Sequence, residues 1–297
     1  MDSDLIEPVR RFNRTVTQRI GALNEEYLAR SRPLGASRVL WEIGDGADVR
    51  VLRARLDLDS GYLSRLLRRL EAEGLVRVQP APGDHRVRVA RLTEAGRRER
   101  AELDRRSDEL AWSLLAPLND RQRSRLLEAM ETARKLLTAG LVQIAVADPA
   151  GRAAQFCLRS YFAELDARFD AGFDPGASIP AAADELTEPA GLFLVAQIHG
   201  EPVGCGALKL HGSEPAELKR MWVAADARGL GVGRRILAEL EHHARQRGVS
   251  VVRLETNQRL TEAIGLYRSA GYDEVPAFND EPYAHHWFAK HLNRPGA

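Results

Sequence analysis

A glycine-rich segment in the second half of the chain has the residue types needed to bind a diphosphate. It reads Arg228-Gly229-Leu230-Gly231-Val232-Gly233-Arg234, after an alternating apolar run at residues 217–223 and before an amphipathic stretch at 234–247. Glycines let a backbone curl so that successive N–H groups point into one concavity, and a following helix adds its N-terminal dipole. No Gly-Lys-Ser/Thr follows, and the Gly-x-Gly-x-Gly spacing differs from that of dinucleotide folds. An ordinary helix-entry loop is the alternative.

The surroundings of this loop resemble the GNAT family of acetyl-CoA-dependent N-acetyltransferases over residues 142–292. The resemblance rests on the run Glu217-Leu218-Lys219-Arg220-Met221-Trp222-Val223 and on the Arg-x-x-Gly-x-Gly loop that begins at Arg228. It also rests on Glu262-Ala263-Ile264-Gly265-Leu266-Tyr267-Arg268-Ser269-Ala270-Gly271-Tyr272, which is similar to the Ala-x-x-Leu-Tyr-x-x-x-Gly-Tyr/Phe stretch of these enzymes.

The resemblance implies a site for acetyl-CoA as co-substrate. Backbone amides from Leu230 to Arg234 would hold the pyrophosphate with Arg228 beside it, and the pantetheine arm would add like a strand along residues 221–223. The implied coenzyme contacts are Met221, Trp222, Val223, Arg228, Gly229, Leu230, Gly231, Val232, Gly233 and Arg234. Tyr267 would protonate the departing thiolate, since a phenol and a thiol have ordinary pKa values of about 10 and about 8.5. A half-buried helix aromatic is the alternative for Tyr267.

The group that takes a proton from the attacking amine is open at this point. Direct attack on a thioester needs a neutral amine, so a side chain or a water chain must accept that proton. Glu217 is the first candidate and Glu255 the second, with an ordinary surface carboxylate as the alternative for each. His285 and His286 could line the substrate pocket, and no further ligands accompany them to suggest a metal.

Two further features limit the chemistry expected here. Many GNAT relatives carry an Asn where this chain has Leu260, and Asn257 lies out of register, so no coenzyme contact is expected from that loop. Cys157 and Cys205 have no adjacent His, so no covalent intermediate is expected. Two cysteines also cannot form a disulfide framework or a Cys-rich zinc site.

The first half contains an amphipathic helix, beginning at Ser60, with a small and cationic outer face. Its leucines at 63, 66, 67 and 70 form one apolar stripe. The opposite face holds Gly61, Ser64, Arg65 and Arg68, with Tyr62 and Arg69 on its flanks. Such a face suits the major groove, where Ser and Arg bond base edges and flanking Arg holds phosphates. Residues 49–92 carry ten Arg against five acidic residues, although a solvated surface helix is the alternative.

The order of motifs around this helix resembles the MarR family of winged helix–turn–helix regulators over residues 5–138. Leu-Glu-x-x-Gly-Leu-Val at residues 70–76 is followed by Asp84-His85-Arg86 and by Leu-Thr at 92–93. The resemblance implies that Arg86 reaches the minor groove and that Asp84 holds this arginine in place. It also implies a homodimer, formed through residues 5–30 and 100–137, on a pseudo-palindromic double-stranded DNA operator.

These readings predict two domains in the 297 residues. Residues 1–140 are expected to form a mainly α winged helix–turn–helix, with one long helix over 5–30, and residues 141–297 an α/β mixed-sheet acyl-CoA N-acyltransferase fold. No apolar run approaches the ~20 residues that span a bilayer, and no secretory signal is recognised, so a cytoplasmic location is expected. The acidic balance of residues 141–297, 16 basic against 20 acidic, favours a cationic substrate.

The function expected from the sequence is a DNA-binding regulator joined to an N-acetyltransferase that acts by direct attack of a primary amine. Two alternatives stay open. In one, the GNAT-like half only senses an acyl-CoA or a small amine without turnover. In the other, the first half mainly dimerises an enzyme.

Overall fold

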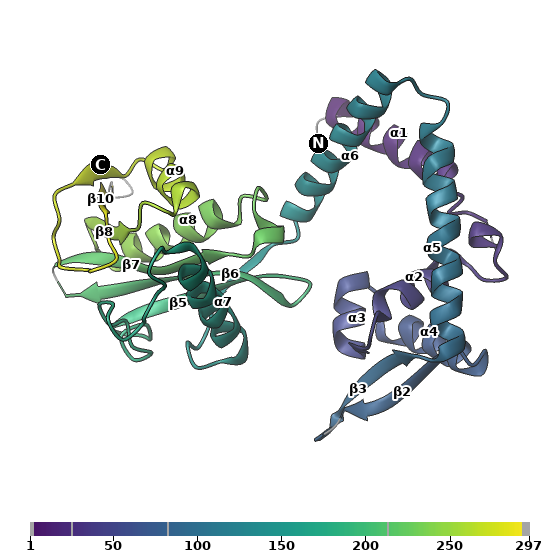
Figure 1. Ribbon diagram of the computed structural model, residues 1–297, viewed down its shortest axis with the longest axis horizontal. Coiled ribbons are helices and arrows are strands. Elements are labelled where there is room, and N and C mark those ends of the chain that lie inside the picture. The colour runs from purple at the N-terminus through teal and green to yellow at the C-terminus, as the bar shows by residue number, and fades with distance from the viewer. Residues whose placement is uncertain (1–2, 25, 82, 213, 293–297) are drawn as a thin grey trace. The chain divides into compact units, whose positions relative to one another are not determined.

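The computed structural model describes residues 3–24, 26–81, 83–212 and 214–292. The chain divides into two compact units, Met1–Met130 and Glu131–Ala297, which are described separately below (Figure 1). Glu25 of the expected first helix, Pro82 of the expected wing turn, and the terminal residues of both expected domains lie outside the described residues. Within the described part, no helix is long and apolar enough to cross a membrane.

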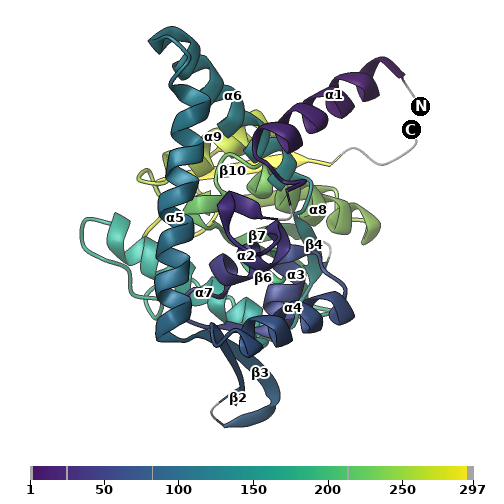
Figure 2. The same ribbon diagram turned by 90° about the vertical axis from the view of Figure 1, so that its right-hand side faces the viewer.

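The first unit is mainly helical and carries one small sheet. Its elements are α1 (Ser3–Arg19), η1 (Tyr27–Ala29), α2 (Leu34–Ile43), β1 (Ala47–Asp48), α3 (Val49–Leu56), α4 (Ser60–Ala72), β2 (Val76–Ala81), β3 (Asp84–Leu92), α5 (Glu94–Leu115) and the start of α6 (Asp120–Ala139). Leu40, Leu52 and Leu63 are fully buried where α2, α3 and α4 pack together. The strands pair in the order β1-β3-β2, and the β2–β3 hairpin projects beyond these helices (Figure 2).

The expected continuous helix over residues 5–30 is wrong, because α1 ends at Arg19. Gly21 adopts a left-handed conformation with φ +66°, and Ala22 donates a hydrogen bond to the carbonyl of Thr17 at 3.2 Å. This pattern closes a helix at a glycine. The chain then turns toward α5, where Arg30 Nε donates to Glu99 Oε1 at 2.9 Å.

In the described residues, the second unit forms a mixed sheet of seven strands in the order β4-β5-β6-β7-β8-β10-β9. The strands are β4 (Gln143–Val146), β5 (Gly191–Ile198), β6 (Glu201–His211), β7 (Glu214–Val223), β8 (Val251–Thr256), β9 (Asp273–Val275) and β10 (His286–His291). The helices are α7 (Arg152–Arg168), η2 (Ala225–Ala227), α8 (Val232–Gln246) and α9 (Thr261–Ser269). The β7–β8 pair is parallel, whereas the other neighbours are antiparallel.

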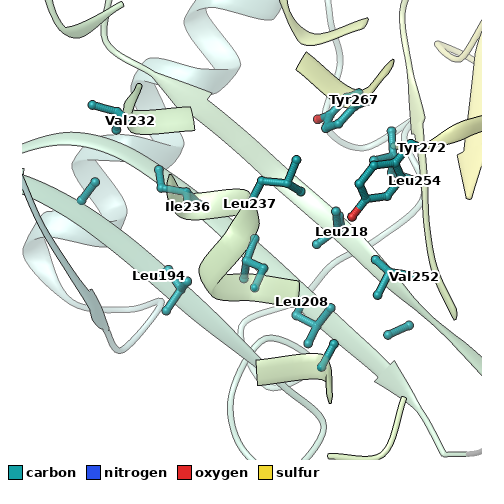
Figure 3. Packing of buried hydrophobic residues seen from close by; sticks show 14 of the residues in the cluster. Leu194, Leu208, Leu218, Val232, Ile236, Leu237, Val252, Leu254, Tyr267 and Tyr272 are labelled. Atoms are coloured by element: carbon teal, nitrogen blue, oxygen red, sulfur yellow. The ribbon is translucent and has the colours of Figure 1, made fainter. Parts of the chain in front are cut away.

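Helices cover both faces of this sheet, because successive side chains of a strand point to opposite faces. Leu194 of β5 belongs to the core cluster that contains Ile236 of α8 (Figure 3). Its neighbour Phe193 instead packs in a second cluster with Cys157 of α7. Gly206 of β6 allows close approach, since a Cβ there would lie 2.7 Å from the Cγ2 of Ile236.

Strand β7 pairs with β8 only near its start. The parallel register joins Ala216 to Val252 and Glu217 to Arg253, and no later residue of β7 pairs with β8 in the described sheet. The pairing of β7 with β6 shifts register just beyond this point, between Lys219 and Trp222. Arg220, which lies in this interval, has a φ of +58°. One extra residue with a left-handed backbone is a β-bulge, which bends a strand. The edge of residues 218–223 that faces β8 is therefore left without a strand partner.

Candidate active site and candidate nucleic-acid interface

A cavity of about 480 Å³ lies along the free edge of β7. Its wall includes Met221, Trp222 and Val223, the start of α8, and side chains from α7 and α9. Nine of the ten expected coenzyme contacts line it. Leu230 is the exception, because its side chain is 7% exposed and packs in the main core. We call this space the donor cavity.

The glycine loop at the donor cavity offers backbone N–H groups that the protein itself does not use. Gly229 and Gly231 have φ values of +81° and +76°, and the space that a Cβ would occupy is open at both. Among the described backbone hydrogen bonds, the N–H groups of Gly229 and Gly231 have no acceptor, whereas Leu230 donates to Ala227 at 3.4 Å. The first-turn N–H groups of α8 add further donors, as at any helix start. This arrangement fits a diphosphate.

Arg228 is tied to the protein rather than extended freely into the cavity. Its Nη2 donates to the two carboxylate oxygens of Glu164 at 2.5 and 2.6 Å, and its Nε donates to the carbonyl of Val223 at 3.2 Å. Trp222 Nε1 also donates to Glu164, at 3.0 Å. Burial alone would raise the pKa of Glu164, but hydrogen bonds from Arg228 and Arg168 lower it below its usual value. Glu164 therefore fixes the loop and the β7 edge together, and the sequence analysis missed it.

A smaller cavity of about 80 Å³ adjoins the donor cavity, and we call it the acceptor cavity. The two share a wall formed by Tyr161, Leu165, Met221, Leu260, Ala263 and Tyr267. Leu260, which stands where many relatives have Asn, is thus an apolar part of that shared wall. Asn257 lines only the acceptor cavity, and its Nδ2 donates to the carbonyl of Tyr283 at 2.7 Å.

Tyr267 lies on the shared wall, and Figure 3 shows it near Tyr272. Its ring contacts those of Tyr272 and Phe288. Burial raises the pKa of its phenol well above the usual value, and the nearby Tyr161 and Glu255 add to the shift. Tyr161 of α7, which the sequence analysis also missed, has its pKa raised to about 12 by burial, against an opposing effect of Arg220. Both phenols are therefore protonated at neutral pH and available as hydrogen-bond donors.

The structure places the first base candidate, Glu217, away from both cavities. Its carboxylate lies 2.8 Å from Arg253, 3.2 Å from Lys219 and 3.7 Å from His211. Burial would raise the pKa of Glu217, but Lys219 and Arg253 outweigh it and lower the pKa, which weakens this carboxylate as a base. The geometry thus argues against Glu217 as the proton acceptor.

Glu255, the second candidate, lines the acceptor cavity together with Tyr267. Its side chain is 9% exposed and bonds to Lys219 Nζ, and Asn279 Nδ2 donates to it at 3.4 Å. His285 and His286 line neither cavity, contrary to expectation, and His286 instead contacts Glu274 at 2.6 Å. Glu255 is therefore the carboxylate of this set that lies closest to the expected chemistry.

In the first unit, α3, a short turn and α4 form a helix–turn–helix. Asp57 in the turn has a left-handed backbone, and Asp59 caps α4 by accepting a hydrogen bond from Tyr62 N at 2.8 Å. The leucines of the expected stripe are buried. The residues of α4 that are expected to contact DNA are all exposed, and Tyr62 is 36% exposed. They are Ser60, Gly61, Tyr62, Ser64, Arg65, Arg68 and Arg69.

These α4 residues differ in how firmly the protein holds them. Within the part of the chain that the structure describes, the contact of the Arg65 guanidinium is its packing over the Tyr62 ring, at 5.7 Å from the centre. Arg69, by contrast, donates to Glu73 at 3.0 Å and to the carbonyl of Ser31 at 3.3 Å. Arg65 is therefore freer than Arg69 to engage a ligand.

The wing carries the Asp-x-Arg motif at the start of β3. Gly83 turns the hairpin with φ +81°, and Asp84 Oδ1 accepts a hydrogen bond from the backbone N–H of Arg86 at 2.9 Å. Asp84 thus holds the main chain of Arg86, and the arginine side chain is exposed. This geometry leaves the guanidinium at the hairpin tip able to reach a groove.

A splayed mixed sheet with a glycine loop at its free edge defines an acyl-CoA-binding fold, and a helix–turn–helix followed by a hairpin defines a winged helix. Comparisons agree with both classes. Residues 158–272 match the model of the acetyltransferase (GNAT) family, and residues 32–87 match the model of the MarR family. Residues 32–87 are therefore similar to the MarR family and residues 158–272 to the acetyltransferase (GNAT) family, whose members use acetyl-CoA as the acetyl donor.

Individual relatives match only parts of the chain. The IAA acetyltransferase of Azospirillum brasilense is 40% identical over 99 residues, which are 33% of this chain and 63% of that protein, so less than two thirds of its length is spanned. A GNAT-family acetyltransferase from Staphylococcus aureus covers 51% of this chain and 99% of its own, with 16% identity and a TM-score of 0.44. A mutant MarR from Escherichia coli, complexed with operator DNA, covers 45% and 98%, with 24% identity and a TM-score of 0.38.

Proposed function

We propose that the second unit transfers an acetyl group from acetyl-CoA to a primary amine by direct attack in a ternary complex. The observation that carries this proposal is the wall that the donor and acceptor cavities share at Met221 and Tyr267. Acetyl-CoA supplies an activated thioester. Side chains of this wall would hold the reacting groups side by side, which converts a bimolecular reaction into an intramolecular one.

Each part of the site has a separate task in this proposal. The N–H groups of the glycine loop hold the diphosphate, and the free edge of residues 221–223 aligns the pantetheine arm through backbone hydrogen bonds. Tyr267 donates a hydrogen bond to the leaving sulfur. Burial raises the pKa of this phenol and so widens its difference from the pKa of a thiol. The proton therefore moves only as negative charge develops on the sulfur.

Glu255 is the proposed acceptor of the amine proton, directly or through a water molecule. It lines the acceptor cavity, whereas Glu217 does not. Lys219, bonded to Glu255, would hold that carboxylate in place. This assignment replaces the first choice made from the sequence.

Acetyl-CoA turnover across a panel of amines tests the enzyme half of the proposal. We expect free thiol to appear together with an equal amount of acetylated amine, identified by mass spectrometry. Free thiol without acetylated amine would indicate hydrolysis and contradict the proposal. Coenzyme binding without turnover of any amine would favour the alternative in which this unit only senses an acyl-CoA.

We propose that the first unit binds double-stranded DNA at a pseudo-palindromic operator. The exposed cationic face of α4 and the exposed Arg86 at the wing tip support this. Selection from random duplexes should enrich two inverted half-sites about one helical turn apart. Enrichment of no sequence would contradict a regulatory role. Since this role requires access to DNA, we also propose a cytoplasmic location.

We propose that the chain acts on DNA as a homodimer. Large apolar side chains are exposed on α1, including Phe12 at 54%, and on α6, including Leu136 at 70% and Leu137 at 71%. α6 has no buried residue in the described chain, so these side chains have no intramolecular cover. Exposed apolar faces of this kind mark protein interfaces. Sedimentation at micromolar protein should give the mass of a dimer, and a monomer that binds DNA equally well would contradict this.

A further inference from the structure

The acceptor cavity contains a cation that no anion among the described residues balances. The charged side chains that line this cavity, among the described residues, are Lys219, Arg220, Glu255 and Glu281. Lys219 is paired with Glu255 and lies 3.2 Å from Glu217, so its charge is balanced within the protein. Arg220 has no carboxylate within ion-pair distance anywhere in the described chain.

The carboxylate of Glu281 is already engaged by loop groups on another part of the cavity wall. Its Oε2 accepts hydrogen bonds from Ser178 Oγ at 3.0 Å and from Ile179 N at 2.7 Å, and its Oε1 accepts one from Tyr283 N at 3.4 Å. These donors tie the loop around residue 178 to the loop around residue 283. Glu281 therefore does not serve as the counter-ion of Arg220.

Aromatic rings rather than anions hold the Arg220 guanidinium in place. Its Cζ lies 5.1 Å from the centre of the Phe162 ring and 6.0 Å from that of Tyr161. The Tyr161 hydroxyl, its polar neighbour, is neutral at physiological pH because the pKa of this phenol is about 12. A guanidinium has five N–H donors in a fixed fork. Most of the donors of this half-buried group are thus unused.

The backbone beneath Arg220 is also fixed in an unusual conformation. A φ of +58° is strained for any residue other than glycine, and such strain persists only where surrounding structure imposes it. The thiol of Cys205 donates to the Arg220 carbonyl at 3.2 Å and holds the bulge from β6. The same bulge therefore frees the β7 edge for the donor and presents a guanidinium to the acceptor cavity.

We propose that the amine acceptor also carries a carboxylate, as a free amino acid does, and that Arg220 binds that carboxylate. Two parallel N–H···O bonds from one guanidinium suit a carboxylate, and aromatic stacking leaves the fork free to make them. This inference rests on the proposed acetyl transfer. It refines the cationic substrate expected from the sequence, because the amine is accompanied by an anionic group.

The reaction balances without a further reactant. The amine nitrogen forms a bond to the acetyl carbon as the carbon–sulfur bond breaks. The amine gives up a proton on the Glu255 side, and the sulfur gains a proton on the Tyr267 side and leaves as the thiol. The carboxylate held by Arg220 is unchanged throughout and serves only to orient the amine.

The test compares matched acceptors that share the carbon bearing the amine and differ in the carboxylate, with kcat/KM expressed per neutral amine because the amine pKa differs among them. Alanine, alaninamide and ethylamine form one set, and phenylalanine, phenylalaninamide and phenethylamine form a second, each followed by thiol release with saturating acetyl-CoA. In at least one set we expect kcat/KM for the amino acid to exceed that for both partners by at least about tenfold, the loss expected when a charged hydrogen bond is removed. Equal or better turnover of the carboxylate-free amines would overturn the inference but leave acetyl transfer standing. Absence of thiol release with every amine would instead count against the proposed function.

Variants of Arg220 show whether this residue is the cause. Arg220→Gln keeps a side chain at the same strained position, and Arg220→Lys keeps the charge without the fork. We expect R220Q to bring the acid-to-amide ratio of kcat/KM close to one, and R220K to give an intermediate ratio. Arg259→Gln is the control, since Arg259 lies outside both cavities with its guanidinium paired to Asp170 at 2.6 Å. A fall in turnover of all acceptors by the same factor in R220Q, with the ratio unchanged, would show a structural role and overturn the inference.

Discussion

The hydroxyl of Tyr267 is proposed to act in catalysis and not in coenzyme binding. Tyr267→Phe keeps the ring packing against Tyr272 and Phe288 and removes only the proton donor. We expect kcat to fall by about 10²- to 10⁴-fold, the usual worth of a positioned general acid. Calorimetry should show nearly unchanged affinity for coenzyme A. Turnover at the wild-type rate would remove Tyr267 from the mechanism.

The two glutamates provide a contrast between a reacting and a structural carboxylate. Glu255→Gln should lower kcat for the amine and leave coenzyme A affinity nearly unchanged, because the group that accepts the amine proton is lost. Glu217→Gln should keep kcat and instead lower stability, because Glu217 bonds to Arg253 and Lys219 in the interior. A kcat that falls in E217Q but stays at the wild-type value in E255Q would reverse the assignment.

Sequence reasoning could bring together those candidate residues whose signal is local. The loop glycines and Tyr267 lie in short motifs, and the structure places them along one cavity. Glu164 and Tyr161 come from α7, which lies more than 50 residues before the loop, and no local pattern marks them. Sequence reasoning preferred Glu217 because an alternating strand pattern does not reveal which cations its carboxylate contacts, and those contacts are what argue against it.

At the scale of elements, the start of α5 depends on a close backbone contact with the start of β2. A Cβ at Gly96 would lie 2.0 Å from the carbonyl oxygen of Leu75. Because this oxygen belongs to the backbone, a side-chain rotation cannot relieve the clash. Gly96→Ala should therefore destabilise the first unit by about 1–3 kcal/mol, although alanine is the better helix former. Denaturant unfolding measures this.

Gly265→Ala in α9 is the matched control for that prediction. A Cβ at Gly265 meets nothing within 4 Å, so only the gain in helix propensity, about 1 kcal/mol or less, is expected. A G96A protein as stable as the wild type would show that α5 and β2 are not packed as described.

The exposed face of α4 predicts a difference between two arginines. Arg65→Ala should weaken binding to a selected duplex and reduce the slope of log K against log salt by about one, the effect of losing one phosphate contact, or else relax specificity at one base. Arg245→Ala is the control, since Arg245 lies on α8 and is paired with Glu241 at 2.9 Å. Equal losses in both variants would show a general effect of charge rather than a contact by α4.

Local periodicity predicts an element well where its own residues define it, and the errors occur where partners lie far apart in sequence. The amphipathic helix predicted from Ser60 begins at that residue as α4. The early end of α1 at Arg19 depends on the conformation of Gly21. The sequence does not predict strand β10, because this strand is formed by pairing with β8, about 35 residues earlier. No local pattern indicates that pairing.

As proposed, the whole molecule joins a DNA-binding unit to a unit that binds an acyl donor, and each unit has its own set of exposed groups without partners in the described chain. In the first unit these groups are the cations of α4 and the wing. In the second they are the N–H donors of the glycine loop. Because each unit has its own core, loss of function in one should leave binding by the other measurable in the full chain.

The most direct test of the account is whether the glycine loop binds the diphosphate of the coenzyme. Titration calorimetry of the full chain should compare coenzyme A with pantetheine, which keeps the arm along β7 but lacks the diphosphate and the phosphorylated adenosine attached to it. We predict clear binding of coenzyme A and at least a hundredfold weaker binding of pantetheine, because about five N–H donors and a helix N-terminus would lose their anion. Equal affinity for the two compounds, or no heat with coenzyme A, would contradict the assignment of the donor cavity.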